Sequence, residues 1–266
     1  MTRLRGPRML RFKSLGSGSA GNATVVESHD GSCCTRLLID AGFTLKQLDA
    51  RLAGAGLQAA QIDAVFVTHE HGDHIGCAFD LAQREQVGVW LSQGTHRALG
   101  SPVLDGLLRL ASDGEPIAIK GLEIRPFTVP HDAREPLQVT CSDGARRLGV
   151  VSDLGHVTSH VLERLALCDA LLFECNHDLD LLAQSNYPPA LKRRIGGTLG
   201  HLSNEAAAQA LQALKHPGLK TVAASHLSAQ NNRPDLVRAA LAQALQCQEE
   251  EILIADQALG TSWLQV

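Results

Sequence analysis

The sequence predicts a four-layer α/β fold, an αββα sandwich in which two β-sheets pack face to face and helices cover both outer surfaces. Three observations support this architecture. Short apolar runs of strand length occur in both halves of the chain, helical stretches are interleaved with them, and no repeat or low-complexity tract interrupts the alternation. At 266 residues the chain can bury a sizeable core. We expect residues 9–266 to form one domain, preceded by a basic, disordered extension at residues 1–8.

The first half of the chain begins with a strand at residues 10–15, which ends in a glycine-rich turn at residues 16–22. Free backbone N–H groups in such a turn could bind a terminal phosphate, although a tight turn between strands explains the glycines equally well. The other strands expected in this half are residues 25–27, 37–40 and 62–67, and the expected helices are residues 45–53 and 75–82. The second of these helices is indicated by apolar residues at helical spacing, namely Ile75, Ala78, Phe79 and Ala82.

The second half of the chain contains two hairpin signals, Lys120-Gly121 and Ser142-Asp143-Gly144, each between apolar runs. Ser203 is placed as the N-cap of one helix and Pro234 lies in the first turn of another. The expected helices are residues 157–166, 203–215 and 234–247. The expected strands are residues 122–129, 148–152, 170–174, 219–225 and 252–255.

The most informative stretch is residues 68–74, which read Thr-His-Glu-His-Gly-Asp-His directly after an apolar strand. His69 and His71 can point the same way as the chain leaves the strand, because alternate residues share a face. Asp73 and His74 would open the following helix and face a second point nearby. Four imidazole and carboxylate groups on one loop suit two divalent metals better than one. The competing interpretation is a solvated polar loop.

Three more metal-type residues stand at strand ends. His131 follows the strand at residues 122–129, Asp153 ends the run at residues 148–152, and His226 ends the strand at residues 219–225. In layered α/β folds, binding sites collect at the carboxyl ends of strands. Each of the three could instead be a turn or capping residue, but their coincidence with the 68–74 segment favours a site.

This set of residues resembles the five motifs of the metallo-β-lactamase superfamily, in the same order along the chain: Asp40, residues 68–74, His131, Asp153 and His226. The resemblance implies the αββα fold of that superfamily and two divalent metal ions per chain, Zn²⁺, Mn²⁺ or Fe²⁺. It implies that Asp153 bridges the two ions. It assigns His69, His71 and His131 to one ion, and Asp73, His74 and His226 to the other.

Differences between this sequence and particular branches of the superfamily argue against some activities and an inserted domain. Asp153 stands where metallo-β-lactamases proper have a cysteine, which argues against antibiotic hydrolysis. His71 stands where flavodiiron oxygen reductases have a glutamate, which argues against redox chemistry. Only 21 residues separate His131 from Asp153, too few for a large inserted lid domain.

A closer resemblance, to the YycJ/WalJ family, covers nearly all of residues 9–266. Its members are bacterial cytosolic metallohydrolases described as 5′→3′ DNA exonucleases. Cys175 stands where serine is commoner in that family, a change not expected to alter the chemistry. The segments that carry the resemblance are residues 17–22, 131–133, 152–155, 174–178, 187–188, 191–195, 200–204, 225–228 and 231–232.

Glu174 and His201 are the candidates for assisting the leaving 3′ oxygen. The Gly200-His201 segment, followed by Ser203 and an alanine-rich helix, is similar to the histidine motif of ribonuclease Z, where a histidine–glutamate pair has that role. Asp73 is expected to orient a metal-bound hydroxide nucleophile besides binding metal. The alternative is structural, with His201 merely preceding a helix and Glu174 ending a strand.

Substrate contacts are expected from residues in these motifs and in one basic run. Lys192-Arg193-Arg194 is the concentrated basic run after the N-terminus, and it could bind phosphates or simply form a solvated helix face. Tyr187 and Trp90 are possible stacking residues, although packing explains them equally well. The predicted substrate-binding residues are Ser17, Asn22, Arg193, Arg194 and Ser228.

Composition limits the remaining choices. A formal net charge of −4 argues against bulk electrostatic capture of nucleic acid, although a local basic groove remains open. The seven cysteines show no C-x-x-C pair or disulfide-like spacing, which indicates reduced thiols in a cytosol. No signal peptide or membrane-spanning run is seen, so we expect a cytoplasmic protein with no membrane partner.

The leading functional hypothesis is therefore a dinuclear phosphodiesterase on nucleic acid, a 5′→3′ exonuclease acting on DNA rather than RNA. A thioester or lactone hydrolase of the glyoxalase II or lactonase type shares all five motifs, but it needs neither the Glu174–His201 pair nor the basic run. A non-catalytic metal-stabilised binding protein would normally have lost a ligand, and none is lost here. The sequence does not indicate the oligomeric state.

Overall fold

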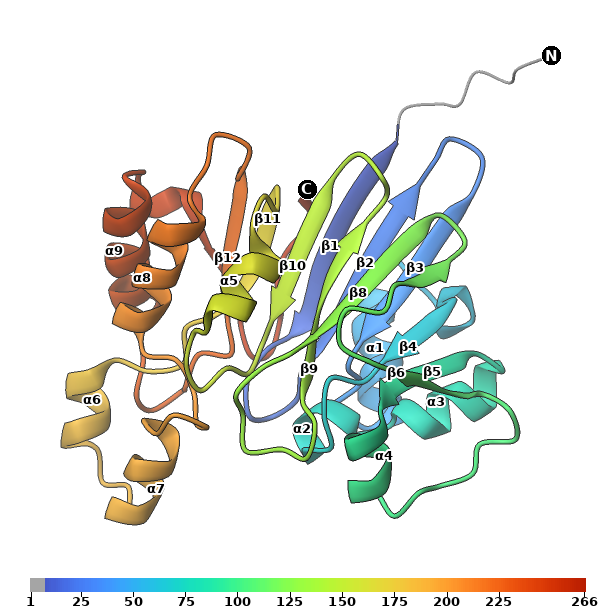
Figure 1. The fold of residues 1–266 in the computed structure, drawn as a ribbon, viewed down its shortest axis with the longest axis horizontal. Helices are drawn as coiled ribbons and strands as arrows, with labels where there is room; N and C mark the ends of the chain where they lie inside the picture. Colours follow the sequence, from blue (N-terminus) through green and yellow to red (C-terminus); the bar gives the residue numbers. More distant parts are fainter. Residues whose placement is uncertain (1–7) are drawn as a thin grey trace.

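The computed structural model describes residues 8–266, which form two mixed β-sheets packed face to face (Figure 1). The first sheet has the order β14 (Leu264–Gln265), β1 (Met9–Gly16), β2 (Ala23–His29), β3 (Cys34–Ile39), β4 (Ala64–Phe66), β5 (Gly88–Ser92) and β6 (Leu108–Ala111). The second has the order β13 (Ile252–Ile254), β12 (Thr221–Ser225), β11 (Ala170–Glu174), β10 (Arg147–Val151), β9 (Leu137–Ser142), β8 (Leu122–Thr128) and β7 (Ile117–Ile119).

Helices cover both outer faces. The first sheet carries α1 (Leu45–Gly54) and α3 (Ala78–Glu85), and the second carries α5 (Ser159–Leu165), α8 (Asn204–Leu214) and α9 (Pro234–Leu245). Shorter helices lie along the lower edge of the molecule in Figure 1. These are α2 (Gly72–Ile75), α4 (Gln93–Ala98), α6 (Leu179–Gln184) and α7 (Pro189–Ile195). Two 3-10 turns, Ala59–Gln61 and Glu249–Glu251, precede strands.

Three apolar clusters account for the layers. One cluster lies between the sheets and includes Phe12 and Phe66 from the first sheet and Val150 from the second. The other two lie between each sheet and its helices. The sheets therefore bury both faces, and the burial of so much apolar surface is the main stabilising contribution. The predicted αββα sandwich is confirmed.

Local signals explain where elements begin. Thr44 caps α1 with a capping box completed by Gln47. The Ser203 side chain accepts a hydrogen bond from Ala206 N, and Pro234 lies in the first turn of α9, both as predicted. The two predicted hairpins join β7 to β8 and β9 to β10.

The prediction of one continuous helix at residues 75–82 is wrong, because the helical conformation is interrupted between α2 and α3. Gly76 has φ of 31°, and a Cβ placed there would lie 2.3 Å from the carbonyl oxygen of Ala41. Cys77 N donates to that same oxygen at 3.0 Å. The contact with the loop after β3 therefore interrupts the helix, and the predicted apolar spacing spans two short helices.

Residues 1–7 of the expected extension lie outside the described residues. Arg8, the last residue of that extension, donates from its side chain to the carbonyl oxygen of Asp143 at 2.7 Å. The seven cysteines are free thiols, and Cys77 is buried in the core beside α3. Within residues 8–266, no helix has both the length and the apolar character needed to cross a membrane.

Candidate metal centre

Residues 68–74 lie where β4 ends and α2 begins. Their backbone is fixed by neighbouring loops, with Asn22 N donating to Asp73 O at 2.8 Å and Ala41 N donating to His74 O at 2.9 Å. Gly42 permits this close packing, since a Cβ there would lie 1.7 Å from Asp73 O. The segment therefore presents its side chains from a rigid frame.

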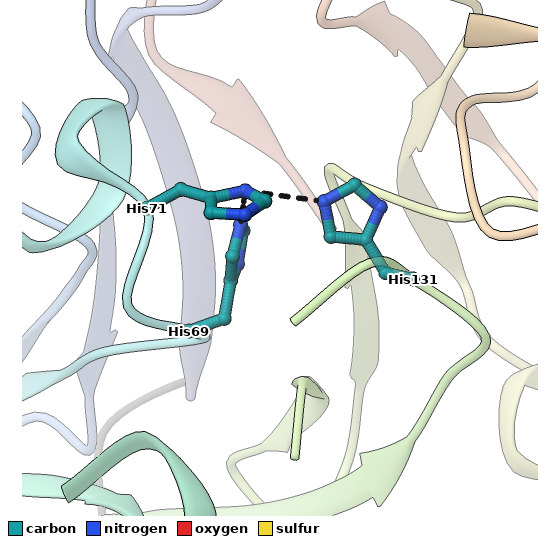
Figure 2. Close-up of side chains that lie close together, drawn as sticks. All are labelled: His69, His71 and His131. Atoms are coloured by element: carbon teal, nitrogen blue, oxygen red, sulfur yellow. Dashed lines mark hydrogen bonds between the residues drawn. The ribbon is translucent and has the colours of Figure 1, made fainter. Parts of the chain in front are cut away.

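The first histidine triad consists of His69, His71 and His131 (Figure 2). His71 Nδ1 lies 3.0 Å from His69 Nε2 and 3.4 Å from His131 Nε2. Two nitrogen ligands of one tetrahedral zinc ion are separated by about 3.3 Å, so this spacing fits a shared ion. His131 Nδ1 donates to the carbonyl oxygen of Gly200 at 3.0 Å, which leaves the Nε2 lone pair free to bind metal.

The second triad consists of Asp73, His74 and His226. Asp73 Oδ2 lies 3.7 Å from the Nε2 atom of each histidine. His74 is oriented by the buried Asp40, whose Oδ2 lies 2.7 Å from His74 Nδ1. Thr68 in turn donates to Asp40 from its backbone and its hydroxyl. A carboxylate behind a histidine in this way is the usual support of a metal ligand.

Asp153 lies between the triads. Its Oδ2 is 2.8 Å from His74 Nε2 and its Oδ1 is 3.7 Å from His131 Nε2, so one carboxylate contacts a member of each triad. Among the described residues, His226 Nε2 is a buried atom without a hydrogen-bond partner, and Asp153 Oδ2 has none besides its contact with His74 Nε2. Buried polar atoms are rarely left unpaired. The donor set therefore fits divalent metal ions, with these atoms as ligands.

The charged groups of the cluster strongly affect one another's pKa values. Burial alone would raise the pKa of Asp153, but the charges of His226 and His74 outweigh burial and hold that pKa well below its ordinary value. Burial lowers the pKa of His226, yet Asp153, Asp73 and Glu174 together raise it to about 10. Burial keeps the pKa of His69 well below its ordinary value. Cations placed at the triads would take over the compensating role of these protons.

The backbone of His226 is held in the left-handed region, with φ of 56°, at the end of β12. Its N–H donates to Ser17 Oγ at 2.8 Å, and its carbonyl oxygen accepts from Asn176 Nδ2 at 2.9 Å. Backbone strain of this kind is common at functional sites. Ser17, predicted as a substrate contact, is therefore buried behind His226 and does not line the cavity.

Asn22 is likewise buried. Its Nδ2 lies 3.4 Å from Asp73 Oδ2 and 3.1 Å from His74 Nε2. The possibility that the turn at residues 16–22 offers free backbone donors is also excluded for most of the turn. The N–H groups of Gly16, Ser17, Gly18, Gly21 and Asn22 all donate within the protein. The turn supports the site and does not offer an anion-binding nest.

Glu174 connects the metal cluster to His201. Its Oε1 lies 2.7 Å from His201 Nδ1 and 3.1 Å from His226 Nδ1, while its Oε2 accepts from Leu154 N and Leu202 N. Burial opposes protonation of His201, but the Glu174 charge and hydrogen bond raise its pKa. The predicted pairing of Glu174 with His201 is present, and His201 lines the cavity with its Nε2 atom free of the carboxylate.

A cavity of about 400 Å³ lies over the cluster. His71, Asp73, Asp153, His201 and His226 line its floor, and Tyr187, Leu191, Arg194 and Ile195 line the wall formed by α7 and the residues before it. Ser228, also predicted to contact substrate, lines the cavity, whereas Arg193 is exposed outside it. A cavity of this volume suits one end of a chain molecule or a small substrate.

Two features of the cavity were not predicted from the sequence. Arg194 is paired with Asp132, its Nε 2.5 Å from Asp132 Oδ2, so the basic run is partly neutralised. Ser19 lines the cavity where Ser17 was expected. The position of Asp132, directly after His131, is the signal that could have pointed to its role.

The fold and this cluster together define a class of protein. The model of the β-lactamase superfamily domain matches residues 35–226, and the chain belongs to the metallo-β-lactamase superfamily.

Within that superfamily the chain is similar to two curated proteins. It is 32% identical to exodeoxyribonuclease YycJ of Bacillus anthracis over 241 residues, 89% of each chain. It is 29% identical to exodeoxyribonuclease WalJ of Streptococcus pneumoniae serotype 2 over 240 residues, 88% of each chain. The fold resembles the metallo-β-lactamase fold protein YhfI of Bacillus subtilis, with a TM-score of 0.75, 17% identity, and coverage of 98% of this chain and 100% of that one.

Proposed function

We propose that this protein is a metal-dependent exodeoxyribonuclease that removes nucleotides from the 5′ end of DNA. The observation that carries the proposal is the similarity, over 88–89% of the chain, to two proteins named exodeoxyribonuclease. The paired triads, with a histidine–glutamate pair beside them, are chemically suited to cleaving a phosphodiester.

The metal requirement follows from the donor set. We assign His69, His71 and His131 to one divalent ion, Asp73, His74 and His226 to a second, and Asp153 to both. When bound, such ions supply a nucleophile at neutral pH and polarise a phosphoryl oxygen. Imidazole-rich sites accept Zn²⁺, Mn²⁺ and Fe²⁺, so availability in the cell decides which is used.

The protein's own groups would handle positioning and proton transfer. Asp73, partly exposed at the cavity floor, orients the attacking water through its carboxylate. Glu174 holds the imidazole of His201 through Nδ1 and, by its negative charge, favours the protonated ring. His201 then donates a proton from Nε2 to the leaving 3′ oxygen, and the electrons of the broken P–O bond remain on that oxygen.

The wall of the cavity would hold the terminal nucleotide. Tyr187 offers a ring on which a base can stack, and Leu191 and Ile195 offer apolar contacts. Arg193, exposed beside this wall, and Arg194 would contact phosphate. A preference for DNA over RNA and a cytoplasmic location are part of the same proposal.

A substrate panel tests the proposal. Metal-free protein and protein loaded with Mn²⁺, Zn²⁺ or Fe²⁺ should be assayed on end-labelled single- and double-stranded DNA and RNA, and on a thioester and a lactone. We expect cleavage of DNA that depends on added metal. Hydrolysis of the thioester or lactone without cleavage of either nucleic acid would replace this proposal with a small-ester hydrolase.

A further inference from the structure

A second groove, of about 470 Å³, adjoins the metal centre. Its lining residues are Glu70, Arg97, Ala98, Asp132, Ala133 and Arg134. Glu70 lies between His69 and His71 in the chain, and Asp132 directly follows His131. Asp132 Oδ1 is 3.4 Å from His131 Nε2 and 3.9 Å from His71 Nε2. The groove therefore begins at the edge of the first histidine triad.

The floor of this groove is rigidly tied to the metal-binding loop. Arg134 N donates to Glu70 Oε1 at 2.7 Å, and Thr95 Oγ1 donates to Glu70 Oε2 at 3.2 Å. Gly94 N, in the first turn of α4, donates to Glu135 Oε2 at 2.6 Å. These bonds lock α4 and residues 132–135 onto the loop that carries His69 and His71.

Two arginines on this frame have no partner among residues 8–266. Arg97 and Arg134 are exposed, and within residues 8–266 neither guanidinium forms an ion pair or a hydrogen bond. Both oxygens of Glu70 are hydrogen-bonded, and Oδ2 of Asp132 is paired with Arg194, whereas Asp132 Oδ1 has no hydrogen-bond partner among the described residues. The guanidinium groups of Arg97 and Arg134 are therefore available to an external anion. Guanidinium groups bind phosphates through paired N–H donors.

The two ends of the site imply a direction for the bound strand. The ring of His131 lies 5.2 Å from that of His71, on the side of the groove, and 5.2 Å from that of His201, on the side of Glu174. Under the proposed function, the released nucleotide carries its 3′ oxygen at His201. The retained strand begins at the phosphate over the metals and must leave by another route.

We propose that the groove beside α4 binds the sugar–phosphate backbone of the retained DNA strand, on the 3′ side of the cleaved bond, and that Arg97 and Arg134 contact its phosphates. This inference rests on the proposed exonuclease function. It places the released nucleotide under α7 and the remaining strand on α4, and that placement accounts for removal of nucleotides from the 5′ end.

The test compares a long single-stranded oligothymidylate with a thymidine dinucleotide, whose single phosphate is the one cleaved, so that none is left to occupy the groove. The readout is the ratio of kcat/KM for the two substrates, together with the slope of log kcat/KM against log salt. Arg97→Ala with Arg134→Ala should reduce the ratio several-fold. The double variant should also flatten the salt slope for the long substrate by about 1.4, because each arginine that neutralises a phosphate of a single strand accounts for about 0.7 of the slope.

Two controls separate charge from structure. The double variant Arg97→Lys with Arg134→Lys should recover most of the salt slope. Lys220→Ala removes an exposed cation at the start of β12, the end opposite His226, and should leave ratio and slope at wild-type values. If the wild-type enzyme degrades DNA and the double alanine variant keeps the wild-type ratio and slope, the groove assignment is wrong but the proposed function stands. A wild-type enzyme that cleaves neither substrate would overturn the proposed function, and the groove assignment with it.

Discussion

The Asp40 carboxylate holds His74 in place but belongs to neither triad. Asp40 has φ of 59°, in the left-handed region that few side chains adopt readily. Its Oδ2 lies 2.7 Å from His74 Nδ1 and it accepts from Thr68, so Nε2 is the nitrogen of His74 that faces the other candidate ligands. Its contribution to function would therefore act through His74.

Asp40→Asn should lower metal affinity by about 10–100-fold, because loss of a supporting carboxylate has effects of this size. Asparagine tolerates the left-handed conformation, so the backbone should be retained. Competition with a chromophoric chelator measures the affinity. Asp49→Asn, on the exposed surface of α1, is the matched control. Equal affinities in the two variants would show that His74 needs no such support.

His201→Ala should reduce turnover on DNA by about 10²–10⁴-fold while metal content stays unchanged, since general acids contribute in this range. A nitrophenyl phosphodiester, whose leaving group needs no proton, should be affected far less. With metal kept at saturation, combining the change with Glu174→Ala should cost little more than either change alone. Equal losses on both substrates would instead indicate a structural role for His201.

Glu174→Gln should differ from His201→Ala in one respect. Glu174 also accepts from His226, a member of the second triad, so its loss should lower metal content as well as turnover. Elemental analysis of the two purified variants measures this. Full metal content in Glu174→Gln would restrict Glu174 to the proton-transfer role.

For individual residues, the sequence indicated the candidate ligands but not most of the hydrogen bonds that hold those ligands in place. Spacing along one loop and positions at strand ends were enough to select the seven ligand candidates. Ser17 and His226 are 209 residues apart in the chain, and Glu174 and His226 are 52 apart. Contacts of such separation depend on how the sheets pack, which no local pattern encodes.

The helix α7 illustrates what could be predicted at the scale of elements. It buries none of its residues, so it has no apolar periodicity to reveal its place over the cavity. The edge strand β6 was missed for a similar reason, because most of its residues are exposed or half-buried. Strands with buried faces, such as β11 and β12, were predicted closely.

Arg193→Ala with Arg194→Ala on α7 should weaken DNA binding and flatten its salt dependence by roughly 0.7–0.9 for each phosphate that the two arginines neutralise. Because we propose that the released nucleotide lies under α7, a dinucleotide should be affected too, unlike the expectation for the groove beside α4. Anisotropy titrations at several salt concentrations measure the slope. An unchanged slope would mean that the basic run is only a solvated helix face.

In the whole molecule, the candidate metal centre lies where strands of both sheets end. His69, His71, Asp73 and His74 follow strand β4 of the first sheet, while His131, Asp153 and His226 follow strands of the second. The αββα arrangement was predictable because apolar strands and helices alternate in both halves. The metals would therefore join the two halves of the fold.

Metal removal should accordingly lower thermal stability. A ligand present at a hundred times its Kd stabilises the folded state by about 2.7 kcal/mol. In a chain of this size that corresponds to a rise in Tm of roughly 5–10 °C per site. Scanning calorimetry of chelated and reloaded protein measures the shift. Loss of metal with no change in Tm would contradict this coupling.

The same architecture predicts two ions per chain, with Asp153 shared. Elemental analysis of reconstituted protein, freed of loosely held metal, should approach this stoichiometry, and Asp153→Ala should lower it most broadly. A firm value of one at saturation would contradict the dinuclear site.

The central claim is that the protein degrades DNA from its 5′ end with the aid of bound metal. The most direct test is a time course on DNA labelled at its 5′ terminus, with metal-loaded wild-type protein and products resolved by length. We expect labelled mononucleotides or very short pieces at the earliest times, without accumulation of long labelled intermediates. A ladder of labelled products that shortens gradually from the other end, or no cleavage with any of Mn²⁺, Zn²⁺ and Fe²⁺, would contradict that claim.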